Sequence, residues 1–353
     1  MIGVSYRWPA EWEAHAGTWL AWPVNRNTWP GIFERIPQSF AKFVAAIARF
    51  EPVFLIADSS LQEDVRKLTG EACSEAAAMH PVNLIDVPVN DSWCRDYGPQ
   101  FLTRRPQADA GKPAQVIVDW DYNAWGKKYP PWDLDAAATT RMSKFISLPV
   151  YQPGFVLEGG AIDGNGADVV LTTRSCLLQP DRNGSVDQAT VESWLSEWIG
   201  ASQVIWLPGG GIEGDDTNGH IDQIARFVDE CSVVVSVPNE QDTVEAEELR
   251  ENARVLAAST IGGRSLHLTE LKRPGRKIQD GRPLPCSYAN FCLCNSGVLC
   301  PTFQDPQDDT AMAVLQSLFP DRQVVGVDCL DLAWGLGALH CLSHEQPAPP
   351  SAL

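Results

Sequence analysis

The segment Leu157-Glu158-Gly159-Gly160 stands at the midpoint of a spacing that predicts the architecture of this chain. Glu158 lies 62 residues after Asp96 and 62 residues before His220. Cys341 follows 121 residues later, which is about two such steps. All four residues fall in polar or glycine-rich loops between apolar runs. Such spacing is typical of proteins in which each repeated unit delivers one loop to a common centre.

The apolar residues support the same repeat. Helical spacing is clearest at Phe40, Phe43, Val44 and Ile47, and similar patterns predict helices near 134–146, 186–199, 244–256 and 310–318. Short apolar runs predict strands at 53–57, 115–120, 168–172, 203–207, 232–237, 265–268 and 323–327. Five α/β units of strand, strand, helix and strand, each of about 70 residues, would fill the chain as a closed ring. Because the units share almost no sequence identity, a chance spacing remains an alternative.

Composition sets the class of protein. The 353 residues suffice for one large domain or two ordinary ones, and we expect a single catalytic domain over 1–347 with a frayed tail over 348–353. A hydrophobic content of 44% excludes general disorder. The net charge of −18 disfavours nucleic acid and anionic membrane as partners and suits a small cationic ligand.

The first 17 residues lack the apolar core of a signal peptide, and no run approaches the roughly 20 apolar residues of a membrane span. We therefore expect a cytoplasmic protein whose ten cysteines are reduced thiols, most of them buried. Cys292 and Cys294 alternate along an apolar run, which favours core packing over metal binding. The sequence predicts no metal and no cofactor, and it leaves a homo-oligomer open.

Cys341 is the candidate nucleophile. It follows the glycine-rich segment 335–337 and lies beside His340, outside any clear core strand. A thiolate is the reactive form, and a bound cation would stabilise it. The alternative is that Cys341 is one more buried thiol.

His220 and Asp222 point to the same face of an extended segment, which pairs a general acid or base with a carboxylate. Asp96 and Asp222 could grip one planar cation through charge-assisted hydrogen bonds, with Trp93 over its face. The alternatives are a loop histidine beside a solvated Asp222, and an ion pair between Asp96 and Arg95.

Glu158 would orient and charge His220 if the two are buried together; otherwise it is a turn residue. Asp215 and Asp216 could cap a helix or bind Ca²⁺, although the ligand spacing of an EF-hand is absent.

Several motifs together resemble those of the agmatine deiminases, within the porphyromonas-type peptidyl-arginine deiminase group. They run from residue 9 to near the C-terminus and comprise Pro9-Ala10-Glu11-Trp12-Glu13, Gly17-Thr18-Trp19-Leu20-Ala21-Trp22-Pro23, Trp93-Cys94-Arg95-Asp96-Tyr97-Gly98-Pro99, Asn123-Ala124-Trp125-Gly126, Leu157-Glu158-Gly159-Gly160, Asp216-Thr217-Asn218-Gly219-His220-Ile221-Asp222 and His340-Cys341.

The resemblance implies a five-bladed α/β propeller of pseudo-fivefold symmetry. It implies hydrolysis of agmatine to N-carbamoylputrescine and ammonia through a covalent thiouronium on the nucleophile, without a cofactor. It assigns the nucleophile to Cys341, the general acid/base to His220, the histidine-orienting carboxylate to Glu158, the guanidinium clamp to Asp96 and Asp222, and the lining of the substrate pocket to Trp93 and Asp216.

The chain departs from the family pattern before the cysteine, where Gly335-Leu336-Gly337-Ala338-Leu339 replaces a run of glycines. This leaves open arginine in peptides, or another small guanidine, as the substrate. A non-catalytic guanidine or polyamine sensor is a third reading, against which the intact set of cysteine, histidine and carboxylates argues.

Overall fold

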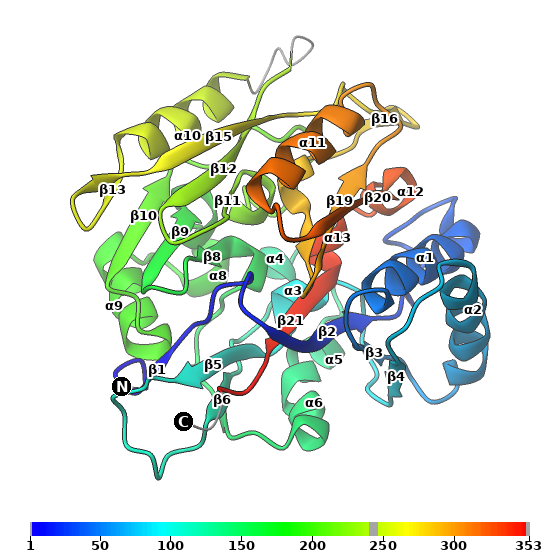
Figure 1. Cartoon of the computed structure of the whole chain (residues 1–353), viewed down its shortest axis with the longest axis horizontal. Helices are drawn as coiled ribbons and strands as arrows, with labels where there is room; N and C mark the ends of the chain where they lie inside the picture. The colour runs from blue at the N-terminus through cyan, green and yellow to red at the C-terminus, as the bar shows by residue number, and fades with distance from the viewer. Residues whose placement is uncertain (1, 240–245, 351–353) are drawn as a thin grey trace.

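The structure is a computed structural model that describes residues 2–239 and 246–350. These residues form a mixed α/β fold in which five sheets repeat one strand order (Figure 1). In each unit the first strand pairs antiparallel with the second, and the second pairs parallel with the third. The predicted order of strand, strand, helix and strand is therefore present five times.

The strands of the five units, in the order first, second and third, are as follows: β21 (Ser343–Pro347), β2 (His15–Ala21) and β3 (Val53–Ile56); β5 (Gln100–Arg104), β6 (Gln115–Val118) and β7 (Val150–Tyr151); β8 (Ile162–Gly164), β9 (Val169–Thr173) and β10 (Gln203–Leu207); β11 (Ala225–Phe227), β12 (Ser232–Val237) and β15 (His267–Lys272); β18 (Cys292–Leu293), β19 (Gly297–Thr302) and β20 (Gln323–Asp328). The first sheet is extended by β4 (Val82–Ile85) and the second by β1 (Tyr6–Arg7).

A helix joins the second strand of each unit to the third, because parallel neighbours cannot be connected by a tight turn. These helices are α1 (Ile36–Ala48), α6 (Ala138–Ile146), α9 (Gln188–Ile199), α10 (Ala246–Ala258) and α11 (Asp308–Leu318). The predicted helices are confirmed, although positions 244 and 245 of one prediction lie outside the described residues. Within the described ranges, no helix has the length and apolar character that crossing a membrane requires.

The helix α1 shows why the periodicity was informative. Phe40, Phe43, Val44 and Ile47 are completely buried on one face of it, and each such side chain contributes about 2 kcal/mol by leaving water. The helix packs against α2 (Gln62–Glu75) and β3.

Most predicted strands are confirmed, and 203–207 and 232–237 have the predicted bounds as β10 and β12. The strand predicted at 265–268 is confirmed only in part, because its last two residues begin β15 and its first belongs to another strand. A short hairpin of β13 (Thr260–Ile261) and β14 (Arg264–Ser265) ends there, and β15 begins only at His267. The turn consists of Gly262 and Gly263, whose positive φ angles of 56° and 77° suit a tight hairpin turn.

Five short helical segments lie immediately before the first strands of the units. They are α3 (Cys94–Tyr97), η2 (Gly159–Ala161), η3 (Ile221–Gln223), η4 (Tyr288–Asn290) and α13 (Leu339–Leu342). Each contacts the next in this order, and α13 contacts α3. Figure 1 shows α3 and α13 in the middle of the molecule, with the sheets around them. The segments that carry the candidate residues therefore meet at the centre.

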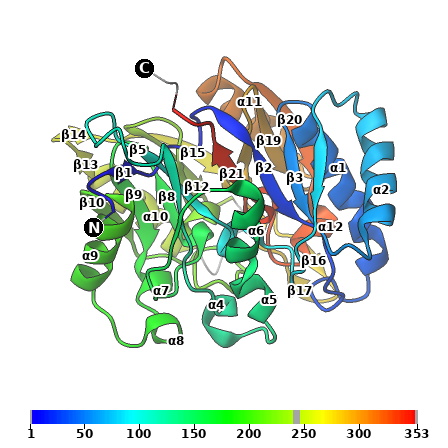
Figure 2. The same cartoon turned by 90° about the horizontal axis from the view of Figure 1, so that it is seen from below.

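The two ends of the chain share one sheet, since β21 pairs antiparallel with β2 (Figure 2). A second tie joins the first unit to the last. The buried Glu51 carboxylate contacts Nδ1 of His15 at 3.1 Å and accepts from Thr18 Oγ1 at 2.5 Å and from the backbone N–H of Asn295 at 2.6 Å. Burial lowers the pKa of His15, but the hydrogen bond and charge of Glu51 outweigh it and raise that pKa to about 9.

We predict that this pair stabilises the fold in a pH-dependent way. Because the folded pKa of His15 lies above its unfolded value, the stabilisation is complete below about pH 6.5 and is lost as the pH rises through about 9. The wild type should lose about 3 kcal/mol of unfolding free energy across this window, whereas Glu51→Gln should be less stable at pH 6.5 and lack that loss. Urea unfolding at several pH values measures both.

Glu34→Gln is the matched control, because it removes an exposed ion pair with Arg26 and should leave the pH dependence unchanged. A Glu51→Gln variant with the same pH dependence as the wild type would contradict the assignment.

Candidate active site

Three candidate side chains converge on Gly160 in η2. A Cβ atom built on this glycine would lie 2.7 Å from Nδ1 of His220, 2.8 Å from Oδ1 of Asp96 and 3.0 Å from Oδ2 of Asp222. The sulfur of Cys341 lies 3.4 Å from the same Asp222 oxygen. Residues that are far apart in the sequence are thus brought into one small volume, which is too crowded at residue 160 for any side chain.

Asp96 is held in one orientation within α3. Its Oδ2 accepts a hydrogen bond from the indole Nε1 of Trp125 at 2.8 Å, and its Oδ1 accepts from the backbone N–H of Gly160 at 2.9 Å. The alternative pairing with Arg95 is not formed, because Arg95 pairs with Glu345 at 2.8 Å. Burial raises the pKa of Asp96 to about 6, against the charge of His220.

Asp222 is completely buried, so it is not the solvated carboxylate of the alternative reading. Its Oδ2 contacts Nδ1 of His340 at 2.8 Å, and its Oδ1 has no hydrogen-bond partner within the described residues. Burial would raise the pKa of Asp222, but the hydrogen bond and charge of His340 lower it. One oxygen of an ionised carboxylate is therefore left without a donor.

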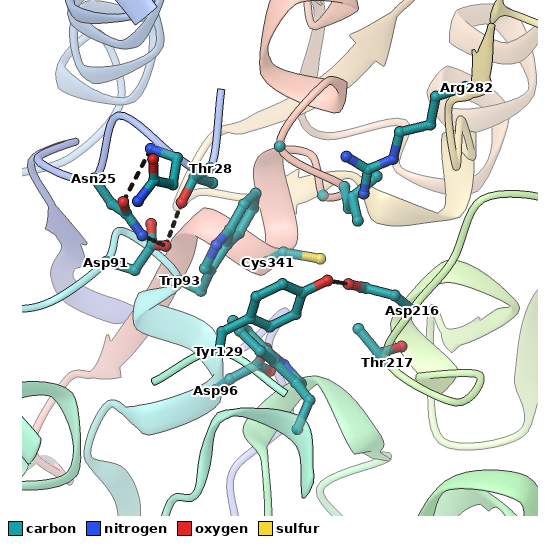
Figure 3. A pocket seen from close by; sticks show the side chains of 15 residues that line it. Asn25, Thr28, Asp91, Trp93, Asp96, Tyr129, Asp216, Thr217, Arg282 and Cys341 are labelled. Atoms are coloured by element: carbon teal, nitrogen blue, oxygen red, sulfur yellow. Dashed lines mark hydrogen bonds between the residues drawn. The ribbon is translucent and has the colours of Figure 1, made fainter. Parts of the chain in front are cut away.

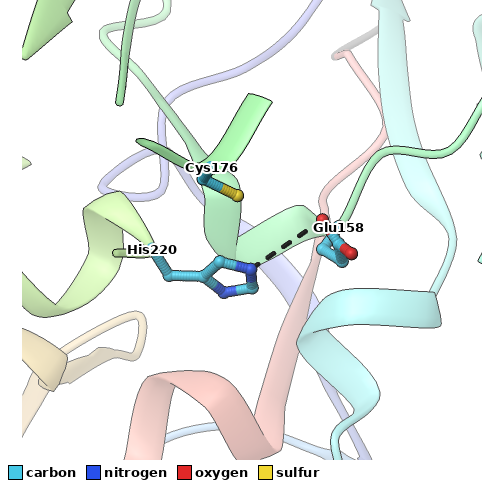
Figure 4. A group of neighbouring side chains, drawn as sticks. All are labelled: Glu158, Cys176 and His220. Atoms are coloured by element: carbon cyan, nitrogen blue, oxygen red, sulfur yellow. Dashed lines mark ion pairs between the residues drawn. The ribbon is translucent and has the colours of Figure 1, made fainter. Parts of the chain in front are cut away.

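His220 is also completely buried. Its Nδ1 lies 3.6 Å from Asp96 and its Nε2 lies 3.9 Å from Glu158 (Figure 4). These are ion-pair distances, and neither ring nitrogen forms a hydrogen bond in the part of the chain described. Burial would lower the pKa of His220, but its neighbours, Asp96 foremost, raise it well above the ordinary value. The imidazole is therefore cationic, and its N–H groups are free to donate.

Glu158 is fixed by a cation. The Nε of Arg182 donates to both oxygens of Glu158, at 2.9 and 2.7 Å, while the same guanidinium donates to the carbonyl oxygen of Thr217 at 2.8 Å. Burial would raise the pKa of Glu158, but Arg182 and His220 lower it to about 2. Glu158 is thus an ionised, buried residue and not a simple turn residue.

Among the described residues, one group of three side chains has donor atoms close enough for a metal ion: Glu158, Cys176 and His220 (Figure 4). The guanidinium of Arg182 already contacts both oxygens of Glu158. A metal ion bound by Glu158 would have to share this carboxylate with a fixed positive charge, so the donor set is a poor fit for a metal. Cys292 and Cys294 pack in the main hydrophobic core.

Cys341 is almost completely buried in α13, and its thiol donates to Asp222. Burial, followed by the charges of Asp222 and Asp96, raises the pKa of the thiol well above its usual value. The thiol is therefore protonated until a positive charge arrives.

A cavity of about 130 Å³ opens onto this centre. Asp96 and Cys341 line it, whereas His220, Glu158 and Asp222 lie behind its wall. Trp93 forms one side and is stacked on Trp29, with ring centroids 5.7 Å apart. Figure 3 shows Trp93 beside the sulfur of Cys341.

Asp216 lies across the cavity from Trp93, and its carboxylate accepts a hydrogen bond from the hydroxyl of Tyr129 (Figure 3). Burial raises its pKa. The turn at this site is made by Asp215, whose carboxylate accepts from the backbone N–H groups of Thr217 and Gly219. Asp216 therefore remains available to the cavity. Arg282 also lines the cavity.

The sequence analysis gave no role in this site to four side chains that support it: Trp125, Arg182, Asn290 and His340. Trp125 lies in a quoted motif but gave no indication of its contact with Asp96. Asn290 donates through Nδ2 to the sulfur of Cys341 at 3.2 Å. A usable signal existed for Asn290, because the 121 residues between His220 and Cys341 leave room for one more unit.

We predict that Gly160→Ala disables the site without unfolding the chain. The added Cβ would occupy the space between His220, Asp96 and Asp222 at contact distances of 2.7–3.0 Å, which displaces groups that must stay within tenths of an ångström. Ammonia release from agmatine, the reaction implied by the resemblance, should fall by at least about 100-fold, with an unchanged circular dichroism spectrum. Gly70→Ala is the control, because no atom lies within 4 Å of its Cβ position. An active Gly160→Ala variant would refute the convergence.

Comparisons with known proteins agree with this geometry. The model of the porphyromonas-type peptidyl-arginine deiminase family matches residues 7–347. The agmatine deiminase of Pseudomonas aeruginosa is 32% identical over 371 residues, covering 98% of this chain and 97% of that protein. The structure of Enterococcus faecalis agmatine deiminase catalysing its reaction superimposes with a TM-score of 0.89 at 27% identity, covering 98% of this chain and 96% of that one. A cysteine-to-serine variant of C. jejuni agmatine deiminase with substrate bound gives a TM-score of 0.87 at 27% identity, covering 98% and 97%. The chain belongs to the porphyromonas-type peptidyl-arginine deiminase family.

Proposed function

We propose that this protein hydrolyses agmatine to N-carbamoylputrescine and ammonia. The observation that carries the proposal is the convergence of the Cys341 sulfur, two carboxylates and a cationic imidazole at Gly160, next to a cavity that Asp96 and Cys341 line. A planar guanidinium that enters this cavity has the shape and charge to bind the carboxylates. The names of the relatives supply the substrate: agmatine for the P. aeruginosa and E. faecalis proteins.

Asp96 and Asp222 form the guanidinium clamp. The free oxygen of Asp222 accepts one N–H of the substrate, and Asp96, oriented by Trp125, accepts another. The clamp must be acidic because a guanidinium remains protonated at neutral pH. Its fixed orientation presents the central carbon of the substrate to the sulfur of Cys341.

The arriving cation allows Cys341 to release its proton to water in the cavity, since it offsets the negative charges that raise the pKa of the thiol. The thiolate then forms a C–S bond to the guanidinium carbon. His220 donates a proton to one terminal nitrogen, the C–N bond breaks and ammonia leaves. A thiouronium remains on Cys341.

Hydrolysis restores the enzyme. His220, now neutral, takes a proton from water while the water oxygen bonds to the thiouronium carbon. The tetrahedral adduct then collapses: the C–S bond breaks, the sulfur leaves as a thiolate, and the hydroxyl group releases its proton to water as it becomes the carbonyl of the urea product. Glu158, itself fixed by Arg182, keeps the imidazole oriented and favours its charged form.

Trp93 and Asp216 contact the part of the substrate that lies beyond the guanidinium group. The indole of Trp93 lines the path from the cavity to Cys341, and Asp216 is a carboxylate on the opposite wall that can accept the distal ammonium group of agmatine. A cavity of about 130 Å³ favours a small substrate over arginine in a peptide.

We also propose how the five sheets are arranged relative to one another. We take the five sheets to be the blades of a closed α/β propeller with pseudo-fivefold symmetry, which the circular contacts of α3, η2, η3, η4 and α13 support. Residues 1–347 would form this single catalytic domain. The tail over 348–353 includes positions 351–353, which lie outside the described residues.

Ammonia release from agmatine, free arginine and a blocked arginyl peptide tests the function. Agmatine should be the best substrate, and Cys341→Ala should lose at least about 1,000-fold in rate while still binding agmatine by calorimetry. Preference for the peptide would favour the peptidyl-arginine alternative. Binding of agmatine by the wild type with no ammonia release would favour the sensor.

The acid limb of the pH profile should report Asp96. Its carboxyl group, with a pKa of about 6 in the free protein, is ionised above that pH and loses its charge below it. The value of kcat/KM for agmatine should therefore fall about tenfold per pH unit below pH 6. Circular dichroism at each pH controls for acid unfolding, and a flat profile down to pH 5 would contradict this assignment.

A further inference from the structure

Asn290 lies in the one of the five central segments that has no part in the proposed mechanism so far. The segment α3 carries Asp96, η2 carries Gly160, η3 carries Asp222 and α13 carries Cys341. The fifth segment, η4, ends at Asn290, which is almost completely buried. It contacts η3 on one side and α13 on the other.

The orientation of the Asn290 amide is settled by its partners. Its Oδ1 accepts hydrogen bonds from the backbone N–H groups of His340, at 3.1 Å, and Cys341, at 3.3 Å. Backbone N–H groups can only donate, so this end must be the carbonyl. The NH₂ end therefore faces the sulfur of Cys341 at 3.2 Å and the carbonyl oxygen of Asp222 at 3.4 Å.

We propose that Asn290 is a further catalytic residue, whose side-chain N–H donates to the sulfur of Cys341 and stabilises its thiolate. This inference rests on the proposed function, because it takes Cys341 as the nucleophile. Within the described residues, no other side chain donates a hydrogen bond to this sulfur. The remaining close side chain, Asp222, is an acceptor that opposes a thiolate.

The chemistry explains why the donor is an amide. A lysine or arginine here would stabilise a thiolate more strongly, but its charge would repel the guanidinium that Asp96 and Asp222 must hold. A carboxylate would add to the negative charge that already opposes ionisation. A backbone hydrogen bond at Ala338 and the neutral side-chain donor of Asn290 both lower the pKa of Cys341, against burial and the charges of Asp222 and Asp96. The amide does so without either penalty. The same N–H receives the sulfur when it leaves the tetrahedral adduct as a thiolate.

The test measures the thiol directly, without turnover. Cys341 lines the cavity, so its alkylation by iodoacetamide can be followed against pH by mass spectrometry of the peptide that contains it. Asn290→Asp keeps an oxygen for the two backbone N–H groups but replaces the donor with a negative charge, and Asn290→Ala removes both ends of the amide without adding a charge. In each variant the rate of alkylation at pH 7 should fall about 10- to 100-fold, the effect expected of a hydrogen bond to a charged group, and the profile should move to higher pH.

Ser287→Ala is the matched control. Ser287 caps the same segment by accepting from the backbone N–H of Ala289, and it donates to the carbonyl oxygen of Gln223 at 2.7 Å. It makes no hydrogen bond to Cys341 among those the structure describes. Its loss should lower stability and leave the alkylation profile in place.

An unshifted alkylation profile in both Asn290→Ala and Asn290→Asp would overturn the proposal, since it would reduce Asn290 to a support for the backbone of α13. Ammonia release by the wild type is measured in parallel and separates the two claims. A shifted profile supports the Asn290 assignment even where agmatine is not turned over, in which case the proposed function fails alone.

Discussion

The carboxylates buried at the centre of this molecule are not fully neutralised by the cations beside them. Glu158 has a permanent cation in Arg182, and Asp222 contacts Nδ1 of His340 at 2.8 Å. Asp96 lies 3.6 Å from His220, and burial raises the pKa of Asp96 to about 6. A buried carboxylate without its own cation is costly. A cationic ligand would supply the missing positive charge. The incompletely neutralised carboxylate therefore lowers the stability of the free protein and favours ligand binding.

The shortage of positive charge also determines how reactive the cysteine is. Burial and two nearby carboxylates keep the Cys341 thiol protonated in the empty site, which protects it from stray electrophiles and oxidants, because these react with the thiolate. In the proposed mechanism, the charge of the bound substrate both positions the carbon to be attacked and permits the sulfur to ionise. Substrate recognition and activation of the nucleophile would then depend on the same charge.

The helices and the repeated units of the fold could be predicted from the sequence because both produce periodic patterns of residues. The stripe of Phe40, Phe43, Val44 and Ile47 predicted α1, and the equal spacing of Asp96, Glu158 and His220 predicted units that share a centre. Prediction from the sequence failed at the hairpin before β15, where a pair of glycines makes a turn that apolar patterning does not report. It also missed Arg182 and Trp125, because contacts across units depend on how the units pack and leave no local trace. Asn290 lies 70 residues after His220 and 51 before Cys341. The long interval between His220 and Cys341 was the one feature of the sequence that indicated a further unit there.

The pairing of β21 with β2 has a consequence for how the protein matures. Cys341 lies two residues before β21, and this strand can pair with β2 only after the residues between them have been synthesised. Until then the edge of β2 is unpaired, and such an edge can associate with other chains. A chain shortened before residue 341 would contain Asp96, Glu158, His220 and Asp222 but not the sulfur of Cys341. Cys341 is therefore synthesised after the other residues of the site, so the thiol enters an environment whose other side chains are already present.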